Sequence, residues 1–341
     1  MNLGLALGGA ARPEEWPRIF EWAARAEALG LHSLWLPEGH FRRGALASPL
    51  VVLSALAART RRLRLATTSL LLPVHHPLRV AQEVAALDLL SGGRVILGVG
   101  RGFAAPLFRA FGLDLREKRD RFDEALDAIL RAWAGERLAL SGDHFATLDG
   151  HTVMPSLRPL QRPHPPLVVA AFGRKGLLQA ARRGLPWLAS PMETLETLAE
   201  NLAFHRAHLP PGVDSARLGM PLMRTAYVAA SDTEARRVRE ALAAESARML
   251  AGLPASLARS AAGPPEARVL VGTAGEVGAL LAGYRERLGM DLLVARIEVP
   301  ATSDVERRAA LERLVQLVAE AAAAEPAAAT RPAPPLRPAD A

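Results

Sequence analysis

The chain of 341 residues contains no cysteine. This absence excludes a disulfide-linked scaffold, a thiolate metal site and a cysteine nucleophile. It also fits a reducing compartment. Lysine is almost as scarce, because only Lys118 and Lys175 occur among the 42 basic residues. The formal net charge of +7 therefore comes almost entirely from arginine.

Long apolar runs are missing as well. No stretch of about 18 consecutive apolar residues occurs, so no membrane-spanning helix is predicted. The first charged residue, Arg12, follows the apolar start of the chain, whereas a secretory signal has its charge in front of the apolar run. We expect a cytoplasmic protein that does not bind a membrane.

The arginines are spread along the chain instead of forming a cluster, which argues against a nucleic-acid partner. Over residues 116–131 they alternate with acidic residues, a pattern typical of a solvated, ion-paired helix face. Hydrophobic residues make up 50% of the chain, which is enough to form one large core.

Short apolar runs alternate with longer helical stretches along the chain. Eight runs are predicted as strands: 2–7, 32–38, 63–72, 94–100, 166–172, 186–190, 222–230 and 291–299. Helices are predicted between them over 13–29, 49–60, 77–90, 116–133, 176–183, 194–208, 233–249 and 305–323. Several strands are apolar throughout, as in a parallel sheet buried on both faces. Eight such alternations predict a (β/α)8 barrel, with a doubly wound open sheet as the alternative.

Three segments interrupt this pattern. Residues 136–166 are rich in Pro, His, Gly and Asp and are predicted to be an inserted lid or hairpin. Residues 252–275 are predicted to be a second insertion. The Ala- and Pro-rich tail over 324–341 is predicted to be disordered. We therefore expect a single domain over residues 1–323.

Candidate functional residues follow the strands, because the sites of parallel barrels lie at the carboxyl ends of their strands. His40 follows the second strand and is a candidate proton donor, although a lone histidine is often structural. His75 and His76 follow the third strand. No metal site is predicted from them, because adjacent side chains diverge and no acidic or histidine partner stands at helical spacing.

Two glycine-containing segments follow the next strands. The run Gly98-Val99-Gly100-Arg101-Gly102 is not a dinucleotide-binding fingerprint, and no helix is predicted directly after it. Its glycines either let the backbone approach a flat ring or a phosphate, or form a tight turn without a ligand. The segment Gly173-Arg174-Lys175-Gly176 lies between a strand and a helix. It is either an anion cradle or an ordinary surface loop carrying two cations.

The residues over 59–103 resemble those of the bacterial-luciferase-like flavin-dependent oxidoreductases. The most specific part is the motif Leu87-Asp88-x-x-Ser91-x-Gly93-Arg94, followed by Gly98-x-Gly100-Arg101-Gly102. Supporting similarities lie at 37–41, 121–136, 159–171 and in the last predicted strand, so the resemblance extends over roughly residues 1–320.

The resemblance implies a luciferase-like (β/α)8 barrel with insertions, usually dimeric, that binds FMN or the deazaflavin coenzyme F-420 at its carboxyl mouth. By position, Thr68 and Ser69 should lie under the flavin ring, where the family often has a non-prolyl cis peptide. Gly100 and Arg101 should approach the flavin. The phosphate should be held by Gly173, Arg174, Lys175 and Gly176. Ser190, after the sixth strand, is a further candidate for the same pocket.

The chain departs from the luciferase catalytic subunit next to its glutamate. That subunit has two histidines at this point, whereas here Gly39 precedes His40. His40 matches the active-site histidine of several deazaflavin-dependent relatives, so it is the candidate catalytic residue.

The function expected from the resemblance is that of a monooxygenase. It would act on a small organic substrate with dioxygen and with reduced FMN from a separate flavin reductase. The absence of a nicotinamide fingerprint fits an external reductant. The alternatives are a hydride-transfer enzyme using coenzyme F-420 and a flavin-binding protein without catalysis. Specificity is expected from the two insertions and from Phe103, His151 and Met192.

Overall fold

The computed structural model describes residues 1–9, 12–215, 218–251 and 263–323. Its ten strands are β1 (Asn2–Ala6), β2 (Ser33–Leu36), β3 (Arg64–Thr67), β4 (Leu70–Leu71), β5 (Val95–Gly100), β6 (Leu167–Ala171), β7 (Trp187–Ala189), β8 (Pro221–Val228), β9 (Val269–Gly272) and β10 (Leu292–Arg296). Eight of them pair in parallel in the order β1-β2-β3-β5-β6-β7-β8-β10, and β10 returns to pair with β1. The predicted (β/α)8 barrel is therefore confirmed, and the open sheet is excluded.

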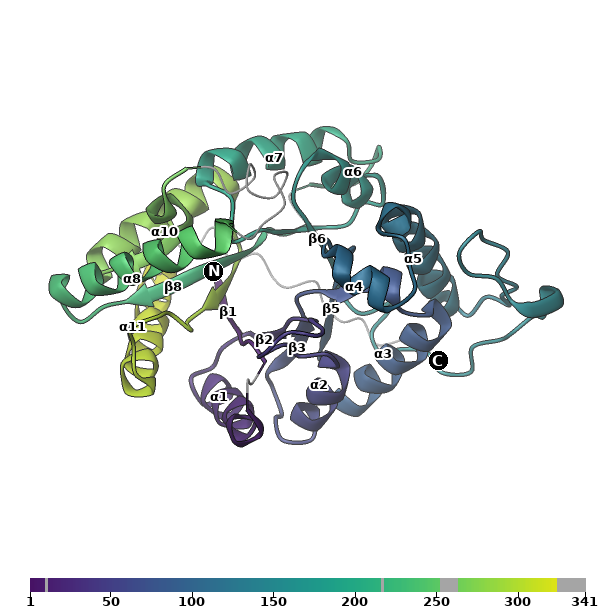
Figure 1. Cartoon of the computed structure of the whole chain (residues 1–341), viewed down its shortest axis with the longest axis horizontal. Helices are drawn as coiled ribbons and strands as arrows, with labels where there is room; N and C mark the ends of the chain where they lie inside the picture. The colour runs from purple at the N-terminus through teal and green to yellow at the C-terminus, as the bar shows by residue number, and fades with distance from the viewer. Residues whose placement is uncertain (10–11, 216–217, 252–262, 324–341) are drawn as a thin grey trace.

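Helices surround the strands (Figure 1). They are α1 (Pro17–Ala28), α2 (Pro49–Ala57), α3 (Pro77–Ser91), α4 (Ala105–Ala110), α5 (Lys118–Ala134), α6 (Arg174–Arg182), α7 (Leu195–Ala207), α8 (Asp232–Ala251), α10 (Ala274–Leu288) and α11 (Asp304–Ala323). All eight predicted strands and all eight predicted helices are present. The sequence interpretation missed α4, α10 and the short strand β9, and it joined β3 and β4 into one strand over 63–72. In α10, three glycines interrupt the apolar periodicity (Gly275, Gly278 and Gly283).

The strands carry two apolar layers on their alternating faces. The layer inside the barrel consists of Ala6, Trp35, Ala66, Ile96, Val168, Leu188, Met223, Leu292 and Val294. The neighbouring residues of the same strands, such as Leu293 and Ala295, belong to the core between strands and helices. Side chains alternate along a strand. Gly100, Thr225 and Arg296, each an even number of residues after an inward-facing residue, therefore face the barrel axis at the carboxyl end, which we call the mouth.

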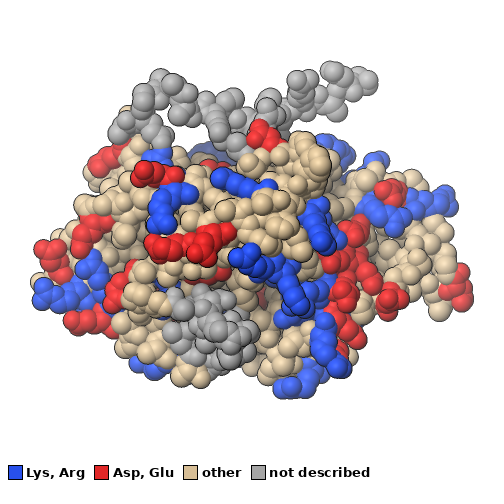
Figure 2. Space-filling view, turned by 90° about the horizontal axis from the view of Figure 1, so that it is seen from above, with Lys and Arg blue, Asp and Glu red and all other residues tan. Residues whose placement is uncertain are grey.

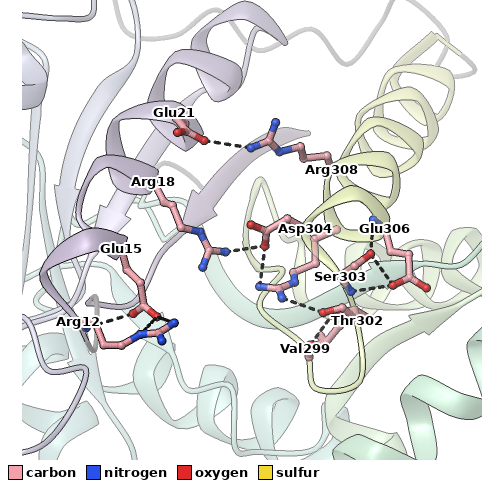
Figure 3. Close-up of polar contacts among 11 residues, drawn as sticks. Arg12, Glu15, Arg18, Glu21, Val299, Thr302, Ser303, Asp304, Glu306 and Arg308 are labelled. Atoms are coloured by element: carbon pink, nitrogen blue, oxygen red, sulfur yellow. Dashed lines mark hydrogen bonds and ion pairs between the residues drawn. The ribbon is translucent and has the colours of Figure 1, made fainter.

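The ring of helices around the barrel is completed by ion pairs between the last helix, α11, and the first, α1. Figure 3 shows Arg18 of α1 paired with Asp304 of α11 at 2.5 Å, and Glu21 paired with Arg308 at 3.0 Å. The hydroxyl of Ser303 and the carboxylate of Glu306 cap the start of α11 reciprocally (Figure 3). These ion pairs, the first part-buried and the second exposed, join segments almost 290 residues apart in sequence.

The segment 136–166, predicted to be an inserted lid or hairpin, contains a hairpin. Two antiparallel bridges join Leu138 to Val153 and Ser141 to Ala146. The hairpin packs against α5, where the Glu124 carboxylate accepts hydrogen bonds from the backbone of residues 144 and 145. It thus lies outside the ring of helices, at the right of Figure 1. Its proposed role as a lid stays a prediction.

The second predicted insertion is only partly irregular. Residues 252–262 lie outside the described part of the chain, as does the predicted disordered tail over 324–341. Residues 263–275 include β9, which pairs with the outer half of β8 from Thr225 to Val228, and the start of α10. β9 is thus an addition beside the eight-stranded barrel.

Charges of both signs are mixed on the face shown in Figure 2, where basic and acidic side chains lie side by side. The predicted ion-paired face of α5 is wrong in part. Arg121 packs over the ring of Phe145 at 4.9 Å and donates to the Pro73 carbonyl, and its side chain is only 13% exposed. Among the described helices, none combines the length and the apolarity needed to cross a membrane.

Candidate active site

The floor of the mouth between β3 and β5 is formed by backbone. The Thr67 hydroxyl donates to the Gly98 carbonyl at 2.7 Å and accepts from the Gly98 amide at 3.0 Å. A Cβ atom at Gly98 would lie 2.0 Å from the Thr67 carbonyl oxygen, and one at Gly100 would lie 2.1 Å from Oγ of Ser69. Both glycines are therefore required by the close packing of the two strands. The Thr68–Ser69 peptide is cis, as expected from the family resemblance.

A half-buried guanidinium, that of Arg101, lies beside this floor, against the first turn of α6. Arg101 donates from Nη1 to Oε1 of Gln179 at 2.9 Å. A Cβ atom at Gly176 would lie 2.0 Å from Nη2 of Arg101, so only glycine permits this contact. α6 begins after Gly173, which has φ of 75° and offers no side-chain cap. The free amides at the start of α6 and the Arg101 guanidinium are thus close together.

Two more cations, from the start of α5, complete what we call the cation cluster: Arg101, Lys118 and Arg119. Burial, followed by the charge of Arg119, lowers the pKa of Arg101 to about 10. Burial and the charges of Arg101 and Arg119 also lower the pKa of Lys118. Nε of Arg119 is buried and has no hydrogen-bond partner among the described residues.

Asp123, the carboxylate whose charge acts on Arg101, is already engaged by other side chains. Asp123 raises the pKa of Arg101, but its oxygens contact Arg183 at 2.7 Å and Gln179 at 2.8 Å. A cluster of three cations, in which like charges lower the pKa values of Arg101 and Lys118, lies next to free helix amides and forms an arrangement suited to an anion. Lys118 and Arg119 were missed because their helix was interpreted as a solvated face.

The remaining predicted cofactor residues, Arg174, Lys175 and Ser190, make no hydrogen bond or ion pair with Arg101 or with the backbone floor within the described chain. The Arg174 guanidinium lies over the ring of Phe204 in α7, 4.8 Å from its centroid. Lys175 is exposed, with no ion pair to another residue of the described segments. The Ser190 hydroxyl accepts a hydrogen bond from the Met192 amide at 3.2 Å, within its own turn. The structure therefore brings Ser69, Gly100, Arg101 and Gly176 together more clearly than it does Arg174 or Ser190.

His40 is held by a buried carboxylate. Its Nε2 lies 2.6 Å from Oε1 of Glu38, and Nε2 of His75 lies 2.8 Å from the same oxygen. The other oxygen, Oε2, accepts from the Leu71 amide at 2.6 Å. Burial opposes ionisation of Glu38, but the contacts with His75, Leu71 and His40 outweigh it and lower the pKa of Glu38. Glu38 is therefore a carboxylate that orients both imidazoles.

The two histidines differ in their access to water. The side chain of His40 is 10% exposed and that of His75 is 32% exposed, whereas the Glu38 side chain is fully buried. The ring of His40 also contacts Phe111, at 5.2 Å between centroids, and Phe41, at 5.6 Å. The described residues contain no group of three potential ligands arranged for a metal ion.

Sequence reasoning missed Glu38 and the role of His75. His75 has no acidic partner at helical spacing, whereas its actual partner, Glu38, follows the neighbouring strand β2. Glu38 could have been predicted as a site residue from its position, because it lies after the second strand, two residues before His40.

A buried polar pair lies behind the mouth, between β7, β8 and α7. The fully buried Arg224 guanidinium donates to the carbonyls of Ser190, at 2.5 Å, and Glu193, at 2.7 Å. The Glu193 side chain accepts from Nδ2 of Asn201 at 2.9 Å, but its Oε2 is buried with no partner in the described chain. Burial raises the pKa of Glu193 to about 7, against the opposing effects of Arg224 and Asn201.

Comparisons with known proteins agree with this architecture. A monooxygenase of Streptomyces bottropensis has the same fold, with a TM-score of 0.79 and 27% identity over 94% of this chain and all of that one. The oxygenase component of a flavin-dependent trigonelline monooxygenase of Acinetobacter baylyi is 29% identical over 64% of this chain and 61% of its own length. An F-420-dependent glucose-6-phosphate dehydrogenase of Amycolatopsis mediterranei is 31% identical over 58% of this chain and 61% of its own.

The matches to curated relatives cover only about half to three fifths of the length of those proteins. The family model for luciferase-like monooxygenases, by contrast, matches residues 3–292, which include seven of the eight barrel strands, apart from Asn2 of β1, and only the first residue of β10. The chain belongs to the luciferase-like monooxygenase family.

Proposed function

We propose that this protein is a flavin-dependent monooxygenase that binds FMN at the mouth of its barrel. The cation cluster beside the first turn of α6 is the observation that carries the proposal. A phosphate monoester needs several cations and free amides, and both are present there. The trigonelline monooxygenase component, a flavin-dependent relative, supports the same assignment.

The residues of the mouth have separate roles in this proposal. The backbone floor at Thr68, Ser69 and Gly100 would support the flat ring. Arg101 and the turn from Gly173 to Gly176, through its Arg174 and Lys175 amides, would hold the phosphate, with Lys118, Arg119 and Lys175 adding positive charge. When bound, reduced flavin supplies the electrons and the atom at which dioxygen reacts.

His40 would exchange a proton with the reacting groups. Its ring is fixed by the Glu38 carboxylate at 2.6 Å, which sets the orientation of the other ring nitrogen. Because His75 shares the same carboxylate oxygen and is more exposed, it would connect the site to water. The reduced flavin would come from a separate reductase. We further propose a homodimer located in the cytoplasm.

A hydride-transfer enzyme using coenzyme F-420 is the second candidate. The cation cluster would also suit a polyanionic cofactor tail. The similarity to an F-420-dependent glucose-6-phosphate dehydrogenase favours this alternative as well.

Titration with the two cofactors tests these proposals. Quenching of cofactor fluorescence should give a lower dissociation constant for FMN than for coenzyme F-420, and the reverse order would favour the second candidate. Oxygen consumption with supplied reduced FMN should then fall about 10²–10⁴-fold in His40→Ala, the usual scale for a lost acid–base group, without loss of FMN binding. FMN binding with no catalysed oxygen consumption in the wild type would identify a silent flavin-binding protein.

A further inference from the structure

Arg296 is the last residue of β10 and its side chain faces the mouth. Leu292 and Val294, four and two residues earlier, belong to the layer inside the barrel. Arg296 is also in register with Ala6 of β1, which belongs to the same inner layer, and with Thr225 of β8. Because side chains in register on paired strands lie on the same face, Arg296 and Thr225 face the barrel axis side by side.

This guanidinium has no hydrogen bond or ion pair with any other residue of the described ranges, and the Thr225 hydroxyl has no hydrogen bond there either. Arg296 is exposed to water, yet burial lowers its pKa, against the opposing charges of Glu245 and Glu298. Its exposed position at the carboxyl end of β10 leaves the guanidinium accessible to a ligand. The neighbouring carboxylates of Glu245 and Glu298 lie outside ion-pair distance.

Arg296 lies across the mouth from the cation cluster. In the closed order of eight strands, β10 and β5 are four positions apart in either direction. Arg101 directly follows β5, so a cofactor phosphate held by the cation cluster would lie on the opposite wall. Arg296 therefore remains available for a second anion.

The opposite wall also provides apolar surface. Phe103, which follows β5, contacts Phe172, which follows β6, edge to face with 6.3 Å between ring centroids. Phe103 is 46% exposed, so its ring is accessible to a ligand. A molecule that spans the mouth would thus meet aromatic rings at one end and a guanidinium at the other.

On the basis of the proposed function, we infer that Arg296 and Thr225 bind the carboxylate of the substrate, and that the substrates are organic carboxylates with an apolar ring or chain. A guanidinium binds a carboxylate through two parallel hydrogen bonds, and a hydroxyl can donate a third. A single negative charge matches one arginine. A doubly charged phosphate would be repelled more strongly by Glu245 and Glu298.

Binding of acid and amide pairs tests the inference. Benzoate, phenylacetate and octanoate would each be titrated into the FMN-loaded protein alongside the corresponding amide, by calorimetry. At least one acid should bind tenfold or more tightly than its amide. Arg296→Gln should weaken acid binding at least tenfold and remove the preference, whereas Arg296→Lys should retain part of it. Arg137→Gln removes the same charge from an exposed residue of the 136–166 hairpin and should change nothing.

Equal binding of every acid and its amide, or unchanged acid binding in a folded Arg296→Gln variant, would overturn the inference. Far-ultraviolet circular dichroism establishes that the variants fold. The dissociation constant of FMN, measured in parallel, separates this inference from the proposed function. If FMN fails to bind while acid binding to the protein alone depends on Arg296, the carboxylate site stands and the proposed cofactor does not.

Discussion

Two arginines at opposite ends of the barrel show how differently one side chain can be used. Arg94, directly before β5, has all five of its guanidinium N–H groups satisfied by protein. They donate to the carbonyls of Ser91, Leu63, Ala57 and Thr60 and to the hydroxyl of Thr60, at 2.6–3.1 Å. Arg296, at the end of β10, has no such partner in the described chain. The first arginine joins elements of the fold, and the second is available to a ligand.

The motif that identifies the family lies at the end opposite the mouth. Asp88 is fully buried and accepts from the backbone amide of Gln161 at 2.9 Å and from its Nε2 at 2.8 Å. The same Nε2 group donates to the Val95 carbonyl at 2.9 Å. Asp88 and Arg94 thus fasten α3 and the segment before β6 to the bottom of β5. This motif identifies the fold without specifying a substrate.

The largest change in the free energy of unfolding is expected when the contacts of Arg94 are removed. Arg94→Met should leave several carbonyls unpaired and lower the free energy of unfolding by about 3 kcal/mol, since each unsatisfied buried group costs about 1–3 kcal/mol. Urea unfolding measures the change. At temperatures where the variant is folded, the FMN dissociation constant should equal that of the wild type. If Arg94→Met lost FMN binding but kept normal stability, Arg94 would serve the ligand and not the fold, against this comparison.

Glu193, near the mouth, should make stability depend on pH. Its pKa is about 7 in the folded protein, above the ordinary glutamate value of 4.5 that applies to the unfolded chain, so the folded protein binds more protons between these values. Stability should therefore fall as pH rises from about 4.5 to 7. The loss is on the order of 3 kcal/mol, from about 1.36 kcal/mol per pH unit.

Urea unfolding from pH 5 to pH 8 measures this slope. Glu193→Gln should flatten the dependence, whereas Glu200→Gln, which changes an exposed residue of α7, should retain it. Equal slopes in the wild type and in Glu193→Gln would show that another group is responsible.

Removal of Arg101 should affect the ligand and leave the fold intact. Arg101→Gln should raise the FMN dissociation constant about 10- to 100-fold, the range for a charged hydrogen bond worth about 1.5–3 kcal/mol. The free energy of unfolding without cofactor should not fall, because the change relieves repulsion from Lys118 and Arg119. Unchanged FMN affinity would place the phosphate elsewhere.

The smallest effect is expected where α1 meets α11. Arg308→Ala should lower the free energy of unfolding by less than about 1 kcal/mol, because its partner Glu21 and Arg308 itself are both solvent-exposed (Figure 3). Chemical denaturation with and without 1 M salt measures the contribution. A loss of several kcal/mol would mean that this contact is essential for closing the barrel.

The sequence predicts the barrel well because its strands are short apolar runs with local turn signals. It cannot predict the cation cluster fully, because α5 contributes Lys118 and Arg119 only after it has packed beside α6. The contact between Glu38 and His75 likewise depends on the register of two strands. Arg296 was open to prediction, since a charge two residues after Val294 in an apolar strand falls on the inner face.

The long strand β8 pairs with a different strand along each of its two halves. Its residues from Pro221 to Thr225 pair with β10 and close the barrel, and those from Thr225 to Val228 pair with β9 outside it. The two ladders meet at a single residue, so the chain between β8 and β10 can vary in length and composition without shifting the closing register. An insertion or deletion in the chain between β8 and β10 should therefore change the surface beside the mouth and leave the barrel closed.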